Sequence, residues 1–172
     1  GGLLGFATAS GGGGFTLGTP QATTSGTSFN FGSIPAGTKQ IIVSFQGVSM
    51  TAGDYLFVQL GDAGGIETTG YVSSSMFARP TADGNLTATN DTVAFTIDYQ
   101  DGTGTFSGHM ILTLVNSSTF LWTSSHLGKL TTIWFAWGGG DKALSAELTQ
   151  VTVTRSGTAT FDAGSVNIMY IG

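Results

Sequence analysis

The stretch KQIIVSFQGVSMTAGDYLFVQLGDAGGIETTGY, residues 39–71, decides the fold class of this chain. Two apolar runs, residues 41–48 and 55–60, are separated by a short turn built from Ser, Met, Thr, Ala, Gly and Asp. β-branched and aromatic residues suit a pleated, half-buried strand, whereas Gly and Asp let the backbone turn sharply. The stretch therefore predicts a hairpin that delivers an acidic, glycine-rich loop to the end of a β-sheet.

Strand patterns recur outward from this stretch, from residue 28 onward, at intervals of about eight to twelve residues, as an all-β sandwich or barrel requires. Gly and Thr interrupt every window in which a helical stripe could form, and each Gly inside a helix costs about 1 kcal/mol relative to Ala. The pattern predicts an all-β, jelly-roll-like antiparallel β-sandwich. The expected strands cover residues 28–32, 39–48, 55–61, 70–77, 92–99, 105–115, 119–124, 131–137, 144–155 and 165–171.

The domain organisation follows from length and from a change in composition. A chain of 172 residues accommodates one domain with a sizeable core. Residues 1–27 are rich in Gly, Ser and Thr and include the run GGGG, so they bury too little apolar surface to fold alone. We expect residues 1–27 to be a linker or arm and residues 28–172 to form the sandwich domain.

Composition limits the classes of partner. Only 9% of the residues are charged while 40% are hydrophobic, which indicates large neutral surfaces that are buried against other copies of the chain. The net charge is −5, and five scattered Lys and Arg residues make no patch that could neutralise a row of phosphates, so nucleic-acid binding is not expected. No apolar run approaches the ~20 residues of a membrane-spanning helix, so membrane insertion is not expected either.

Catalytic and metal-binding patterns are weak. His109 and His126 are the only histidines, there is no cysteine, and neither His has the neighbours that zinc or nucleophilic chemistry needs. Asp62 and Glu67 are the one pair of acids close enough in sequence to suggest glycoside hydrolysis, which requires two carboxyl groups facing a cleft. Loop acids more often make turns or bind Ca²⁺ and hydroxyl groups, so we expect no catalytic residue. In the absence of a His or Cys cluster we expect no metal site, and we expect no cofactor.

Aromatic side chains are the remaining candidates for ligand contact, because Trp and Tyr rings stack on sugars while Asp, Asn and Arg bond their hydroxyls. Core or subunit-interface packing is the alternative role. In the expected strand 131–137, Trp134 and Trp137 point to opposite faces, so at least one of them should lie outside the core. Trp137 is favoured because it adjoins an expected loop at residues 138–142. The candidate ligand-binding residues are Trp137, Asp141, Trp134, Trp122, Tyr71, Arg79, Asp62 and Glu67.

Three segments, FNFGSIPAGTKQIIVSFQGVS, VQLGDAGGIETTGYVSSS and TFDAGSVNIMYIG, resemble the C-terminal domains of tailed-bacteriophage tail fibres and tailspikes. Those domains share a Phe-x-x-Ile-Pro motif, a strand ending in Gly-Val-Ser, a Gly-Asp-x-Gly-Gly loop with Thr-Gly-Tyr, and a terminal Phe-x-Ala-Gly-Ser strand. The matching positions are residues 31–35, 47–49, 61–65 with 69–71, and 161–165.

The resemblance implies a homotrimeric β-sandwich at the distal tip of a virion appendage, extracellular when it functions. It implies binding to a host surface structure, lipopolysaccharide or capsular polysaccharide, without enzyme activity, and we expect host specificity to reside in residues 72–142. Two other classes remain open. The chain could be a polysaccharide depolymerase or esterase module with Asp62 and Glu67 as its acids, or a purely structural virion domain.

Overall fold

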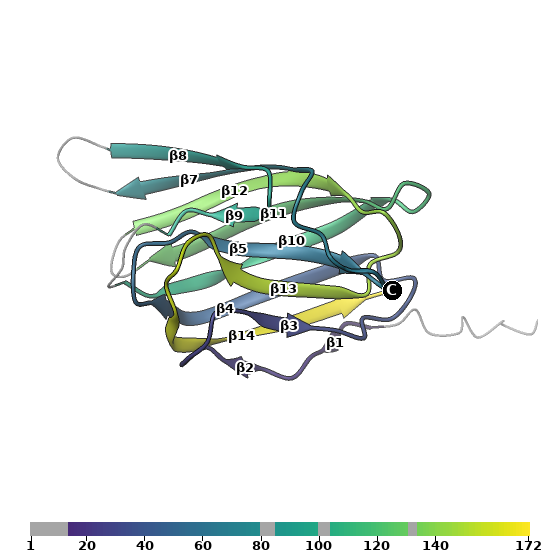
Figure 1. Cartoon of the computed structure of the whole chain (residues 1–172), viewed down its shortest axis with the longest axis horizontal. Coiled ribbons are helices and arrows are strands. Elements are labelled where there is room, and N and C mark those ends of the chain that lie inside the picture. The colour runs from purple at the N-terminus through teal and green to yellow at the C-terminus, as the bar shows by residue number, and fades with distance from the viewer. Residues whose placement is uncertain (1–13, 80–84, 100–103, 131–133) are drawn as a thin grey trace, which may run out of the picture.

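Figure 1 shows a computed structural model of the chain, which describes residues 14–79, 85–99, 104–130 and 134–172. Throughout these ranges the regular secondary structure is β-strand, without any helix, and the strands form two antiparallel sheets. The all-β prediction is therefore confirmed. None of the described residues belongs to a helix with the length and apolar character needed to cross a membrane.

In the larger sheet, three pairs of strands that are successive along the chain lie side by side and antiparallel. Neighbouring strands pair antiparallel along its whole width. Within the described residues its order is β1 (Thr16–Leu17), β14 (Phe161–Ile171), β4 (Gln40–Met50), β10 (Phe106–Asn116), β11 (Leu121–Leu130), β12 (Trp134–Ala143), β7 (Tyr71–Arg79) and β8 (Asn85–Asp91), and β2 (Gln21–Ala22) also pairs with β14.

The smaller sheet lies over one face of the larger one and stands in front of it in the view of Figure 1. Its order along the described chain is β3 (Phe29–Phe31), β13 (Gln150–Arg155), β5 (Leu56–Asp62) and β6 (Gly65–Ile66), with β9 (Phe95–Ile97) paired to β5. A single cluster of buried apolar residues draws on both sheets, so the core is the layer between them.

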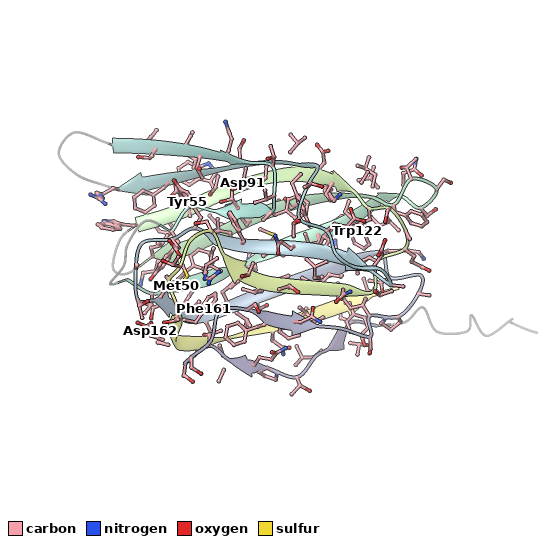
Figure 2. All side chains as sticks on the ribbon, in the orientation of Figure 1. Met50, Tyr55, Asp91, Trp122, Phe161 and Asp162 are labelled. Atoms are coloured by element: carbon pink, nitrogen blue, oxygen red, sulfur yellow. The ribbon has the colours of Figure 1, made fainter. Side chains whose placement is uncertain are left out.

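Alternation along the strands builds this core. In β4, Ile41, Val43 and Phe45 point inward and are at most 4% exposed. The register then shifts at Gly47, whose φ of 60° is in the left-handed region that favours glycine. Beyond this β-bulge Val48 and Met50 point inward as well, because the extra residue changes the phase of the alternation. Met50 pairs with Phe161 of β14 at the end of the molecule remote from Trp122 (Figure 2).

The predicted hairpin of residues 41–48 and 55–60 is wrong. β4 pairs with β14 and β10 in the larger sheet, whereas β5 pairs with β13, β6 and β9 in the smaller one. The short turn between them therefore crosses the core from one sheet to the other. Turn residues reverse the chain equally well in both arrangements, so local composition could not distinguish them. The acidic loop does follow β5, as predicted.

The expected loop at residues 138–142 is also wrong, because these residues lie inside β12. Glycine is required there by close packing. A Cβ atom on Gly138 would lie 2.1 Å from the Ser74 carbonyl oxygen, and one on Gly140 would lie 2.1 Å from that of Val72. Residues 131–133 of the predicted strand are outside the described ranges.

Other strand boundaries also differ from the prediction. β8 was not predicted, and the expected strand 92–99 is reduced to the three residues of β9. The expected strand 119–124 extends to Leu130 as β11. The expected strand 144–155 begins only at Gln150, as β13.

Part of the predicted arm lies along an edge of the larger sheet. β1 and β2 pair with β14, and the backbone N–H of Thr23 donates to the Gly164 carbonyl at 2.9 Å. The Thr23 hydroxyl donates to Ala163 at 2.7 Å and its side chain is fully buried. Residues 1–13 of the predicted arm lie outside the described ranges.

The glycine run in β12 provides a test of the fold. Gly138→Ala should lower the free energy of unfolding by about 2 kcal/mol, because the added methyl group overlaps a backbone oxygen that cannot move without breaking the sheet. Denaturant unfolding measures the loss. Gly32→Ala is the matched control, since its nearest neighbour would lie at 3.7 Å, and it should change stability by less than about 0.5 kcal/mol. Equal stability of the two variants would contradict the packing of β12.

Candidate functional site

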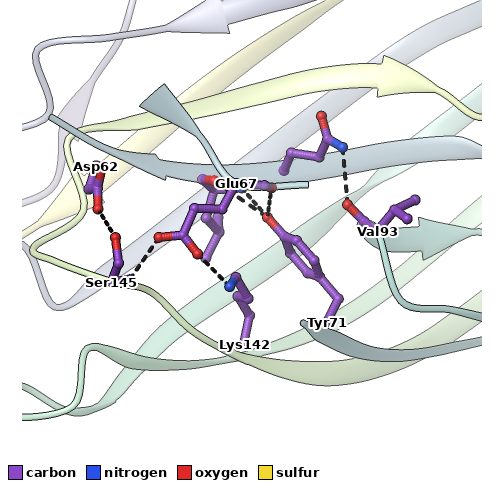
Figure 3. Close-up of polar contacts among 8 residues, drawn as sticks. Asp62, Glu67, Tyr71, Val93, Lys142 and Ser145 are labelled. Atoms are coloured by element: carbon purple, nitrogen blue, oxygen red, sulfur yellow. Dashed lines mark hydrogen bonds and ion pairs between the residues drawn. The ribbon is translucent and has the colours of Figure 1, made fainter. Parts of the chain in front are cut away.

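The acidic loop after β5 is held by hydrogen bonds to the segment that follows β12 (Figure 3). The Ser145 hydroxyl donates to Asp62 Oδ2 at 2.5 Å, and the Ser145 backbone N–H donates to Glu67 Oε1 at 2.7 Å. The ammonium of Lys142 forms an ion pair with Glu67 Oε2 at 2.5 Å. We call Asp62, Glu67, Lys142 and Ser145 the inter-sheet clamp, because it joins β5 of the smaller sheet to the end of β12 in the larger one.

Tyr71, predicted as a ligand-binding residue, anchors the same loop from inside. Its side chain is 1% exposed and packs edge-on against Phe95. Its hydroxyl accepts a hydrogen bond from the Leu60 N–H at 2.7 Å and donates to the Glu67 carbonyl at 3.0 Å. Burial raises the pKa of the phenol. Tyr71 is thus a core residue that presents no surface to a ligand.

The clamp keeps both acids ionised. The hydrogen bond from Ser145 lowers the pKa of Asp62 below its ordinary 3.8. Burial opposes ionisation of Glu67, but the hydrogen bonds from Lys142 and Ser145 outweigh it and lower the pKa of Glu67 below 4.5. Stabilisation by these carboxylates is therefore present above their ordinary pKa range and is lost as the pH falls below it. A glycosidase general acid needs the opposite, a raised pKa.

Arg79 and Trp134 form a second group, at the end of β7 and the start of β12. The Arg79 guanidinium lies 4.2 Å from the centroid of the Trp134 ring, close enough for a cation–π contact. Phe77 packs edge-on against the same ring, with centroids 5.4 Å apart. Both Arg79 and Trp134 are half-buried, and Trp134 packs against the core cluster.

Trp137 and Asp141 lie on the outer face of the larger sheet, which confirms that one of Trp134 and Trp137 is outside the core. Trp137 is 37% exposed and pairs in register with Leu127 of β11 and Met76 of β7. Phe135, two residues earlier, is 47% exposed on the same face. We call Met76, Leu86, Leu127, Phe135 and Trp137 the outer apolar face.

Trp122 is placed differently from the other tryptophans. Its side chain is 2% exposed and belongs to the apolar core, so the expectation that it could lie at the surface is corrected. Inward alternation along β11 explains the position, because Trp122, Ser124 and His126 all point toward the smaller sheet. The eight candidate residues thus separate into the clamp loop, the Arg79–Trp134 pair, the outer face and the core.

His126 forms a polar contact inside the core that the sequence did not predict. The expected strand ends at residue 124, but β11 continues through His126, which is 5% exposed, and its Nε2 lies 2.9 Å from the Ser75 hydroxyl. The backbone N–H of Asp98 donates to the same hydroxyl at 2.9 Å. Burial lowers the pKa of His126 to about 4, so the imidazole is neutral. The group is enclosed and offers a substrate no access.

Among the described residues there is no group of three or more His, Cys, Asp or Glu side chains that could hold a metal ion. Comparisons of the chain with protein-family models, with curated proteins and with solved structures find no match. What the described residues define is an all-β domain of two antiparallel sheets, with an acidic loop whose carboxylates bond Ser145 and Lys142.

Removal of the clamp cation should destabilise the domain. Lys142→Met leaves Glu67 partly buried without its cation, and we expect a loss of about 2 kcal/mol in the free energy of unfolding. Lys129→Met, which removes an exposed cation from the neighbouring strand β11, should change stability by less than about 0.5 kcal/mol. The double variant Lys142→Met/Glu67→Gln should recover part of the loss. Equal effects of the two lysine substitutions in denaturant titrations would contradict the clamp.

His126 should make stability depend on pH between its ordinary pKa of 6.5 and its folded pKa of about 4. In this window the unfolded chain binds a proton that the folded chain excludes, so stability falls as the pH falls, by about 3 kcal/mol at most. His126→Gln should remove this part of the pH dependence, whereas His109→Gln, at an exposed position, should leave it. Thermal unfolding at a series of pH values between 4 and 6.5 provides the measurement. If the stability of wild type and of His126→Gln falls equally with pH across this range, the prediction is wrong.

Proposed function

We propose that this chain is the receptor-binding domain of a phage tail fibre, that it assembles as a homotrimer with a jelly-roll-like sandwich in each subunit, and that it binds a host surface polysaccharide during adsorption. The outer apolar face carries this proposal. Leu86 of β8, Leu127 of β11 and Phe135 of β12 are 60%, 52% and 47% exposed on this side of the sheet, and Trp137 pairs in register with Leu127. Apolar side chains that gather on one face of a soluble protein commonly mark an interaction surface.

Assembly of identical subunits accounts for this face better than a sugar site does. Sugar-stacking platforms combine one or two rings with several hydrogen-bonding side chains. Here the rows across the sheet are mainly apolar: Ala88, Met76, Trp137 and Leu127 follow one another in register, and so do Leu86, Ala78 and Phe135. The low charge of the chain and its resemblance to trimeric tail-fibre tips favour a second and third copy as the partners that cover it.

A binding role is favoured over the hydrolase alternative by the state of the two acids. Asp62 and Glu67 are both bonded to Ser145, and the pKa of each carboxyl is lowered rather than raised. Such carboxylates are poor proton donors to a leaving group. The virion location follows from the same proposal.

Light scattering and glycan binding test the proposal together. The wild-type chain should have three times the 17.6 kDa mass of one copy at micromolar concentration, and Phe135→Glu should shift it to monomer. Leu17→Glu, at a 69% exposed position on β1, is the control and should remain trimeric. On an array of purified bacterial lipopolysaccharides and capsular polysaccharides, the trimer should bind at least one glycan without releasing reducing ends. A monomeric wild type that binds none of them would contradict the proposal.

A further inference from the structure

A second row of apolar side chains crosses the outer face of the larger sheet, on the side of the arm. Leu17 of β1, Met169 of β14, Ile42 of β4 and Ile111 of β10 follow one another in register. Leu17 is 69% exposed, and the other three are half-buried. The residues on either side of Ile42 along β4 point into the core, so the row faces outward. We call these four residues the arm-side row.

The arm-side row is separate from the outer apolar face. The neighbour of Ile111 on β11 is Ser125, and the neighbour of Ser125 on β12 is Gly139, so the apolar row ends at β10. The outer apolar face lies on β7, β8, β11 and β12. A trimer built through that face therefore leaves the arm-side row without a partner.

The arm-side row is too small to be the interface with another folded protein. Stable interfaces bury at least about 1,200 Å² and involve about 20–30 residues on each side. The row offers four side chains, and three of them are already half-buried. A short apolar segment tethered to the same domain does not need so large an area, because a short flexible tether raises its effective concentration to about the millimolar range.

The sequence before the arm strands has the composition of such a segment. Residues 1–13 read GGLLGFATASGGG, and Leu3, Leu4 and Phe6 are their large apolar residues. The first charged residue of the chain is Lys39, and the arm-side row is uncharged as well. Contact between the two would therefore bury apolar surface without taking a charge out of water.

Residues 7–13 are long enough to bring this segment to the row. Leu17 itself belongs to the row, and the Gly18 N–H donates to the Ile168 carbonyl at 2.8 Å, so the described chain begins beside it. Seven residues of this flexible composition have a root-mean-square end-to-end distance of about 15 Å. The row crosses four strands, and three strand spacings amount to about 14 Å.

We propose that residues 3–6, LLGF, fold back over the outer face of their own subunit and pack on the arm-side row. The arm is then attached to the sandwich at two places, the edge strand β14 and the outer face of the sheet. This inference goes beyond the proposed function, because the contact needs neither a glycan nor a second copy of the chain.

Paramagnetic relaxation measured by NMR tests the contact. The chain has no cysteine, so Ala7→Cys provides a single site for a nitroxide label. The label should broaden the methyl signals of the arm-side row strongly and that of Leu86, at the far edge of the sheet on β8, much less. Replacing Leu3, Leu4 and Phe6 together by Ser should remove the strong broadening of the row.

Oxidation by hydrogen peroxide gives a second readout without a label. In the triple Ser variant, Met169 should be oxidised at least about threefold faster than in the wild type, because the segment no longer shields its sulfur. Met76, half-buried on the outer apolar face, is the internal control, and its oxidation rate should be the same in both proteins. Mass spectrometry of the digested protein measures both rates.

Two results would overturn the inference: equal oxidation rates of Met169 in the two proteins, or broadening no stronger at the row than at Leu86. Refolding a mixture of nitroxide-labelled copies and isotope-labelled copies identifies the source of the segment. Full broadening in this mixture means that a second copy supplies it, which also overturns the contact proposed here. A monomeric chain that binds no glycan leaves both expected results unchanged, so failure of the proposed function is distinguishable from failure of this inference.

Discussion

Burial of apolar side chains between the two sheets is the interaction on which the rest of this structure depends. The chain has no cysteine, and Lys142–Glu67 is the one ion pair found among its described residues, so cohesion comes from the core, worth about 25 cal/mol per Å² of buried apolar surface. The bulge at Gly47 keeps β4 facing this layer along its whole length. The inter-sheet clamp then fixes one end of β5 against β12.

Much of the fold was predictable because strand alternation is a local property. Inward residues of β7 and β10, and those of β4 on either side of its bulge, follow the expected period of two, and the all-β class follows from it. The partner of each strand was not predictable. β4 and β5 are joined by a turn suited to a hairpin, yet their pairing is decided by β13 and β14, about a hundred residues further on. β8 was missed because NLTATND is polar and pairs only with β7.

The candidate site was predictable to a similar degree. The sequence placed Asp62 and Glu67 in one loop, but the residues that engage them, Ser145 and Lys142, are 83 and 75 positions away along the chain. If the glycines at 138–140 had been assigned to a strand, the alternation of that strand would have predicted that Lys142 points inward. Long-range packing therefore decides which residues surround the two acids.

The position of β14 has a consequence for biosynthesis. β4 is an interior strand, but its neighbour on one side is the last strand along the chain, and Ser49 and the Asp162 that it bonds are 113 residues apart. While the ribosome is still making the intervening segments, β4 has an open edge with apolar residues next to it, which is the kind of surface that recruits foreign strands. Such distant pairing also slows folding. The nascent chain is therefore most vulnerable to aggregation until residues 161–171 emerge, and dependence on chaperones should be greatest before that point.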